Sequence, residues 1–91
     1  MIEYKLEQQR VAAYKNGEEV GEMTFKDMED FYIIDHTGVS NTVQGEGVGK
    51  NLVSTLVEYA RSNGLKILPL CPFAKAEFKK NEAYHDVLQT T

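Results

Sequence analysis

The chain has 91 residues, of which 14 are Asp or Glu and 10 are Lys or Arg, giving a formal net charge of −4. This length accommodates one domain and excludes large architectures such as an eight-fold α/β barrel, which needs roughly 200 residues or more. The acidic balance argues against general binding to nucleic acids or membrane surfaces. We therefore expect a single domain over residues 1–91, with neither nucleic acid nor membrane as a partner.

The distribution of charge and the cysteine content narrow the kind of ligand and the cellular compartment to be expected. Residues 1–43 hold nine acidic and four basic side chains, whereas residues 44–91 hold five acidic and six basic ones, so an anionic ligand should prefer the second part. The single cysteine, Cys71, excludes an internal disulfide and suits a reducing compartment. The N-terminal residues do not show the pattern of a signal peptide, which is a basic stretch followed by an apolar run. We expect a cytoplasmic protein.

Side-chain alternation predicts a run of strands in the first part of the chain. Apolar and charged residues alternate from Ile2 to Glu7, which is the period of a half-buried strand. Asn16-Gly17 is typical of a tight hairpin turn. The segment from Phe31 to Ile34 is apolar on both faces, as expected of a central strand. The predicted strands are residues 2–7, 10–15, 20–26 and 31–39.

The second part of the chain predicts helix, strand and helix. Apolar residues recur at helical spacing from Val48 to Ala60, and Asn63-Gly64 is a typical helix end. Residues 66–70 predict a fifth strand, and residues 72–88 predict a mainly helical segment with a break at Asn81. The whole pattern predicts an α+β fold with a mixed, mostly antiparallel sheet of about five strands and two main helices. The crossover within residues 31–70 should make its two strands parallel neighbours.

A glycine-rich loop joins the fourth strand to the first helix. It reads Gln44-Gly45-Glu46-Gly47-Val48-Gly49. Glycines let backbone N–H groups approach a ligand closely, and the helix behind adds unpaired N–H groups and a positive dipole end, which together suit a phosphate. The spacing differs from the Rossmann and P-loop patterns. A flexible turn before a helix explains the same glycines.

The loop resembles a known family. Gln44-x-x-Gly47-x-Gly49 is similar to the acetyl-CoA pyrophosphate loop of the GNAT superfamily of N-acetyltransferases. The chain resembles more closely a short bacterial GNAT-like subfamily that also carries an Asp-His-Thr strand motif and a Cys-x-Phe-Ala-Lys motif. These correspond here to residues 35–39 and 71–75. The resemblance, which runs from about Ile33 to Leu88, implies a compact GNAT-like fold with acetyl-CoA as acyl donor.

The resemblance also implies a set of cofactor-binding positions. Backbone groups near Val39 would bind the pantetheine arm, and the N–H groups of residues 45–50 would hold the pyrophosphate. The implied set is Val39, Gln44, Gly45, Glu46, Gly47, Val48, Gly49 and Lys50. Lys75, Lys79 and Lys80 would lie near the adenosine 3′-phosphate, although a solvated helix face accounts for them equally well. No metal site is expected.

Cys71 and His36 are the candidate catalytic residues. Pro72 favours an extended Cys71 at a helix N-cap, where thiol pKa values fall, although most free cysteines are simply small buried hydrophobes. His36 could act as a base toward an amine or toward Cys71, and the alternative is a hydrogen-bonded core histidine. Strict alternation would place His36 on the opposite face from Asp35 and Thr37. Pro69 indicates an edge position or a strand that diverges from its neighbour.

Two departures from the wider superfamily bear on function. The resemblance places Phe78 at the position of the usual Tyr general acid, and Tyr84 comes one or two turns later. The helical segment between the first two strands, which forms much of the acceptor site in larger relatives, is missing. Both features leave the acceptor amine unspecified: it could be a small molecule or a protein.

Three functions are compatible with this pattern. The first is an acetyl-CoA-dependent N-acetyltransferase, acting directly with His36 or a water as base, or through S-acetyl-Cys71. The second is a non-catalytic CoA or acyl-CoA binding module or sensor. The third is an interaction domain that binds a nucleotide or phosphate through the glycine loop alone, which the Cys71 motif disfavours.

Overall fold

The computed structural model describes residues 1–90. Its strands and helices follow each other in the predicted order, and Thr91, the last residue of the expected domain, lies outside the described residues. The elements are β1 (Ile2–Glu7), β2 (Arg10–Lys15), β3 (Glu18–Asp27), β4 (Phe31–Val39), the 3-10 turn η1 (Asn41–Val43), α1 (Val48–Ser62), β5 (Lys66–Pro69), α2 (Pro72–Lys80) and the 3-10 turn η2 (Glu82–Val87).

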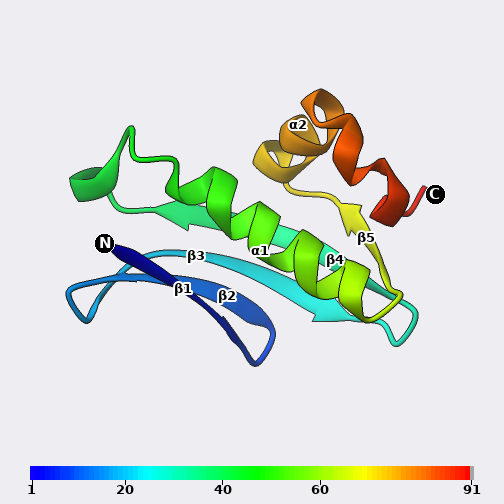
Figure 1. Cartoon of the computed structure of the whole chain (residues 1–91), viewed down its shortest axis with the longest axis horizontal. Helices are drawn as coiled ribbons and strands as arrows, with labels where there is room; N and C mark the ends of the chain where they lie inside the picture. The colour runs from blue at the N-terminus through cyan, green and yellow to red at the C-terminus, as the bar shows by residue number, and fades with distance from the viewer. Residues whose placement is uncertain (91) are drawn as a thin grey trace.

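The five strands form one sheet in the order β1-β2-β3-β4-β5. The first four are antiparallel neighbours, and β5 pairs with β4 in parallel. The long helix α1 lies across the sheet, and α2 sits beyond it next to β5 (Figure 1). The predicted α+β fold, with a mixed and mostly antiparallel sheet and two main helices, is confirmed.

A β-bulge in β4 corrects one expectation from the sequence. The register changes so that Thr24 pairs with His36 and Phe25 pairs with Ile34, which leaves Asp35 as an extra residue. Such a residue shifts the alternation of every side chain that follows it. Asp35 and His36 therefore share one face of the sheet, and the prediction that they lie on opposite faces is wrong.

The hydrophobic core lies between the sheet and α1. The apolar stripe of α1, predicted from its helical spacing, is buried against inward side chains of the strands. Ala74 and Phe78 from α2 join the same core, and η2 packs beside α1. The largest fully buried side chains are Met23, Ile34, Leu52, Leu56, Ile67, Val11, Val43, Val48, Val53 and Val57.

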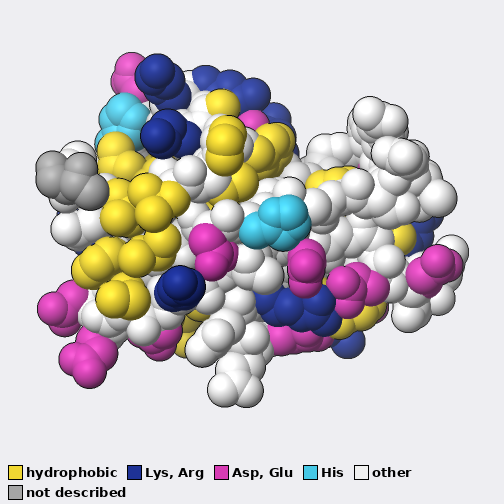
Figure 2. All heavy atoms as spheres, turned by 180° about the vertical axis from the view of Figure 1, so that it is seen from behind, with side chains coloured by type: hydrophobic (Ala, Val, Ile, Leu, Met, Phe, Trp, Pro, Cys, Tyr) yellow, Lys and Arg dark blue, Asp and Glu magenta, His cyan; other side chains and the backbone are white. Residues whose placement is uncertain are grey.

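The other face of the sheet carries no helix among residues 1–90. Seen from behind, the molecule has apolar side chains gathered in one area and acidic side chains spread over several places (Figure 2). Arg10 lies between Glu7, Glu19 and Glu22, with an ion pair of 2.8 Å to each. None of the helices in the described part of the chain is long and apolar enough to cross a membrane.

Candidate active site where two strands part

Strands β4 and β5 stay paired for only four rungs. Their pairing begins at Phe31 opposite Lys66 and ends at Ile34 opposite Pro69. The N–H groups of Leu70 and Cys71 both donate to the carbonyl oxygen of Ile34 at 3.1 Å, and β5 goes no further. β4 continues to Val39, so among residues 1–90 its edge beyond Ile34 has no strand partner on that side. The divergence that Pro69 suggested is therefore present.

Cys71 lies at this divergence. It is extended, with φ −65° and ψ 132°, and it is the N-cap of α2 with Pro72 at the first helical position. The side chain is only 6% exposed, and its Sγ lies 3.4 Å from the Thr37 hydroxyl oxygen. Burial raises the pKa of the thiol, but hydrogen bonding to the Thr37 side chain and to backbone groups of Ala74, Phe73 and Thr37 outweighs burial, so the pKa falls below its usual value.

His36 lies on the face of the sheet that α1 does not cover. Its side chain is exposed and stands opposite Thr24. The ring lies close over the next glycine along the strand, because a Cβ added to Gly38 would be 3.2 Å from Nε2 of His36. Within residues 1–90 no hydrogen bond joins His36 to Cys71. The contact that the structure does provide, between Thr37 and Cys71, depends on the bulge and could not be found by strict alternation.

The glycine loop has the backbone conformation that its sequence favours. Gly45 and Gly47 have φ values of 87° and 73°, in the left-handed region that other residues rarely adopt. Gly47 is the N-cap of α1 and makes no side-chain cap, and the first turn of the helix carries no acidic residue. In the described part of the chain, the N–H groups of Gly47, Val48 and Gly49 donate to no backbone acceptor. These groups are therefore free to bind an anion.

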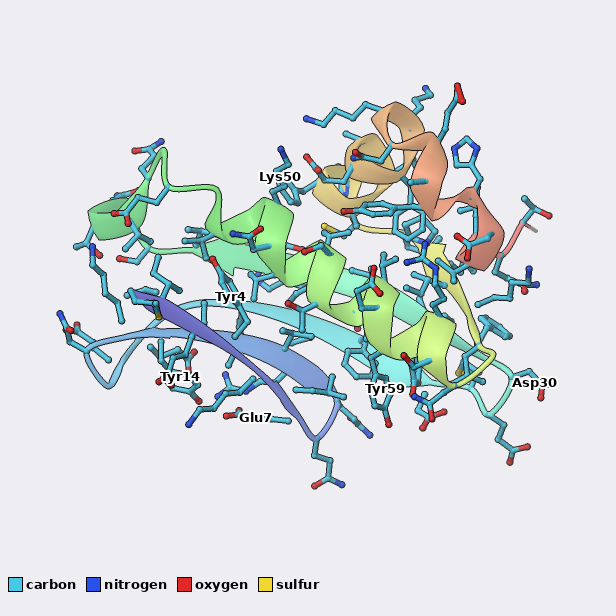
Figure 3. The ribbon with its side chains drawn as sticks, viewed as in Figure 1. Tyr4, Glu7, Tyr14, Asp30, Lys50 and Tyr59 are labelled. Atoms are coloured by element: carbon cyan, nitrogen blue, oxygen red, sulfur yellow. The ribbon has the colours of Figure 1, made fainter. Side chains whose placement is uncertain are left out.

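Two other loop residues already have partners. The N–H groups of Gln44 and Glu46 donate to Asn41 and Val43 within the turn. The Glu46 carboxylate pairs with Lys15 at 3.3 Å. Lys50 is exposed on the first turn of α1, whereas Tyr59 lies toward the other end of that helix (Figure 3). Within the described residues, the unpaired backbone N–H groups of the predicted loop are thus those of Gly45 and of residues 47–50.

Gly49 brings the two sequence motifs together. A Cβ added at Gly49 would lie 2.8 Å from Cζ of Phe73, the aromatic residue of the Cys71 motif. The ring of Phe73 therefore rests directly on the first turn of α1. Gly49 is needed for this close approach of two helix starts, and its φ is not in the left-handed region.

The lysines of α2 and Phe78 face away from the glycine loop. Lys75 and Lys79 line a hollow over Pro69 and Leu88, and Lys80 pairs with Glu77 at 3.1 Å. Among the described contacts none joins these lysines to the glycine loop. Phe78 is buried with its ring 5.5 Å from that of Tyr84.

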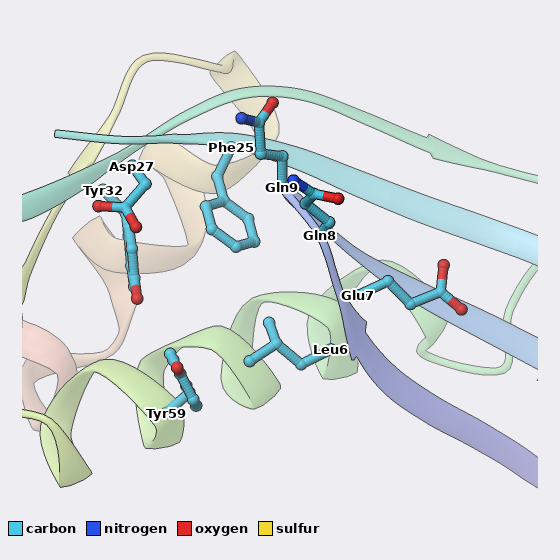
Figure 4. Close-up of a pocket in the computed structure, with 8 residues that line it drawn as sticks. All are labelled: Leu6, Glu7, Gln8, Gln9, Phe25, Asp27, Tyr32 and Tyr59. Carbon is cyan, nitrogen blue, oxygen red and sulfur yellow. The ribbon is translucent and has the colours of Figure 1, made fainter. Parts of the chain in front are cut away.

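Another hollow lies toward the end of α1 that is farther from the glycine loop. It has a volume of about 250 Å³, and its walls include Phe25, Tyr32 and Tyr59 (Figure 4). Tyr59 comes eleven residues after the start of α1, which places it about 16 Å along that helix from the glycine loop. Burial, together with Tyr59 and Asp27, raises the pKa of Tyr32 to about 12. Among residues 1–90, no three His, Cys, Asp or Glu side chains are grouped to hold a metal ion.

Comparison with models of known protein families identifies the family of this chain. Residues 3–87 match the family model described as GCN5-related N-acetyl-transferase.

The chain belongs to the GCN5-related N-acetyltransferase family.

Solved structures agree with this assignment. A GCN5-like protein from Staphylococcus aureus, to which N-acetyltransferase activity is ascribed, is 36% identical over 98% of this chain and 89% of its own, with a TM-score of 0.78. A ribosomal-protein-alanine N-acetyltransferase from Brucella melitensis shares the fold at 20% identity, with 90% of this chain and 62% of its own covered and a TM-score of 0.64.

A third structure contains the acyl donor. It is a Bacillus anthracis protein, to which streptothricin acetyltransferase activity is ascribed, in complex with acetyl coenzyme A. It is 19% identical, with 66% of this chain and 36% of its own covered and a TM-score of 0.57, so it supports the fold alone. No curated protein sequence matches the chain. Membership of the family indicates acetyl-CoA-dependent N-acetylation as the class of reaction.

Proposed function

We propose that this chain is an acetyl-CoA-dependent N-acetyltransferase that carries the acetyl group on Cys71 before passing it to an amine. The observation that carries the proposal is the position of the Cys71 thiol at the start of α2, beside the unpaired edge of β4, where hydrogen bonds lower its pKa from the ordinary value. A thiolate is the reactive form of cysteine, and a helix N-terminus favours it. The contact of Thr37 with Cys71 also supports membership of the short subfamily with the Asp-His-Thr and Cys-x-Phe-Ala-Lys motifs.

The acyl donor has suitable partners on this chain. The free N–H groups at the start of α1 suit a pyrophosphate, and the unpaired edge of β4 near Val39 suits an amide-containing arm. The proposed binding residues remain Val39, Gln44, Gly45, Glu46, Gly47, Val48, Gly49 and Lys50. The N–H groups of Gln44 and Glu46 serve by shaping the loop, since they already bind within it.

The reaction proceeds in two balanced steps. The Cys71 thiolate attacks the acetyl carbonyl of the donor, a new C–S bond forms, and the C–S bond to CoA breaks as CoA leaves as its thiolate. One thioester replaces another, so no oxidant or reductant is needed. The acceptor nitrogen then attacks S-acetyl-Cys71, loses a proton and takes the acetyl group, and the Cys71 thiolate is restored.

His36 is the proposed base for the second step. It is exposed on the face of the sheet that α1 leaves uncovered, whereas the Cys71 thiol contacts Thr37 on the covered face, so His36 would act on an acceptor that reaches the thioester through the gap where β4 and β5 part. Phe78 has no ionisable proton, so it cannot act as a general acid. Its side chain is buried and packs against Tyr84. The acceptor is an amine of a small molecule or a protein. The lone thiol must remain reduced to act, which suits the cytoplasm.

Intact-mass analysis tests the covalent step. After incubation with acetyl-CoA and no amine, the wild-type chain should gain one acetyl group, and the Cys71→Ala variant should gain none. Adding a panel of primary amines should discharge the acetylated protein. Absence of acetylation in the wild type, with acetyl-CoA bound, would exclude the covalent route.

The second candidate is a non-catalytic CoA or acyl-CoA binding module. Two features favour it: Phe78 replaces the usual acid, and β1 and β2 are joined by a turn of two residues, Gln8 and Gln9, without a helical segment. A titration followed by amide NMR separates the candidates. A binding module would show perturbed amides at residues 39–50 but neither S-acetylation nor transfer to any amine.

A further inference from the structure

We propose that Thr37 is a positioning residue for the Cys71 thiol, accepting its S–H while the sulfur is neutral and donating its own O–H once the sulfur is ionised. This inference rests on the proposed role of Cys71, although its test requires no acetyl transfer. A hydroxyl can serve both states because it has one donor and two acceptor sites.

The geometry supports a direct contact. Thr37 Oγ1 lies 3.4 Å from Cys71 Sγ, which is a normal separation for a hydrogen bond to sulfur. Thr37 pairs across the sheet with the fully buried Met23, so it lies on the helix-covered face of β4. In the described part of the chain the Thr37 hydroxyl has no other side-chain partner. It is therefore free to reorient when the thiol loses its proton.

The bulge in β4 places Thr37 on that face. Asp35 is the extra residue, and the Thr24 hydroxyl donates to its carboxylate at 2.5 Å. Without the extra residue the strand would turn Thr37 to the uncovered face, because side chains alternate along a strand. The bond between Thr24 and Asp35 stabilises the bulge and so helps to hold the hydroxyl at the thiol.

No charged side chain is among the principal groups that act on this thiol. Burial opposes ionisation, and the groups that favour it are the Thr37 side chain and backbone together with the backbone of Phe73 and Ala74 at the start of α2. The Thr37 hydroxyl is the one side chain among them, and it is the largest favourable contribution. Without the hydroxyl, the effect of burial should raise the pKa of the Cys71 thiol. A smaller fraction of the thiol would then be ionised at neutral pH.

The rate of alkylation across pH measures this effect. Cys71 is the only cysteine, so iodoacetamide reports on it alone. Thr37→Val keeps the shape and removes the hydroxyl, and it should move the alkylation profile to higher pH and slow the reaction at pH 7 by about threefold to tenfold. Thr37→Ser keeps the hydroxyl and should stay close to the wild type. Thr55→Val makes the same chemical change on α1 and should leave the profile unchanged.

Two outcomes overturn the inference. One is a Thr37→Val profile that matches the wild type, and the other is a Thr37→Ser profile that moves as far as that of Thr37→Val. Circular dichroism checks that each variant is folded, and Thr37→Ala, which removes the same hydroxyl without adding bulk, carries the test if Thr37→Val does not fold. Failure of Cys71 to become acetylated, with these profiles as expected, would overturn the proposed function and leave the role of Thr37 intact.

Discussion

Gly49 at the start of α1 and Phe73 at the start of α2 touch, with only 2.8 Å between Cζ of the ring and the position that a Cβ on Gly49 would occupy. This contact joins the glycine loop to the Cys71 motif, although 24 residues separate them in the sequence. The two helix starts that would bind the pyrophosphate and carry the thiol are thereby held next to each other.

The first prediction concerns this contact. Gly49→Ala should destabilise the protein by about 1–3 kcal/mol, because an added methyl group would overlap the ring and the packed helix starts would have to move. Urea unfolding of the variant measures the loss. In the double variant Gly49→Ala, Phe73→Ala, the loss attributable to Gly49→Ala should shrink, since the ring is gone. Simple additivity of the two single changes would show that the contact is not the cause.

The second prediction separates backbone strain from ligand binding. Gly47 and Gly64 have φ values of 73° and 68°, and at each an added Cβ would meet open space. Gly47→Ala and Gly64→Ala should each cost about 1–2 kcal/mol of unfolding free energy, because the left-handed conformation is unfavourable for alanine. Only Gly47→Ala should also weaken acetyl-CoA binding, which calorimetric titration measures. Equal affinity in the two variants would argue against a role for the loop.

The third prediction assigns His36 to the second half of the reaction. In His36→Gln, Cys71 should acquire its acetyl group at the wild-type rate, whereas release to an amine should slow by about 10²-fold or more, the usual worth of a positioned general base. Rapid-quench intact-mass measurements follow both steps. His85→Gln, which changes a histidine bonded to the Phe78 carbonyl, is the control and should leave both rates unaltered. Slower acetylation of Cys71 in His36→Gln would contradict the assignment.

The fourth prediction concerns alkaline pH. Burial raises the pKa of Tyr32 from its ordinary value of 10 to about 12. Between these values the unfolded chain loses the phenol proton while the folded chain keeps it, so folding stability should be unaffected below about pH 10 and decline by about 2 kcal/mol as the pH approaches 12. Tyr32→Phe should flatten this decline. Urea unfolding at a series of pH values is the measurement, and the same decline in Tyr32→Phe would exclude Tyr32 as its source.

The local patterns in the sequence predicted most of the fold. The bounds of β1, β2 and β4 and the first residues of both helices agree with the predictions from alternation and helical spacing. These agreements follow from short-range physics: a strand with one buried face alternates, and a helix with one buried face repeats every three to four residues. The break at Asn81 is also confirmed, since α2 ends at Lys80 and η2 follows.

The sequence by itself thus determined the elements, their order, the free backbone at the start of α1 and the lone thiol at the start of α2. The tertiary structure alone decided which side chain meets that thiol, because one extra residue in β4 exchanges the faces of His36 and Thr37, and such a bulge arises from the pairing of two strands. It also decided what Gly49 is for, because the close approach of Phe73 depends on how two helices pack and leaves no trace in the spacing of residues along the chain.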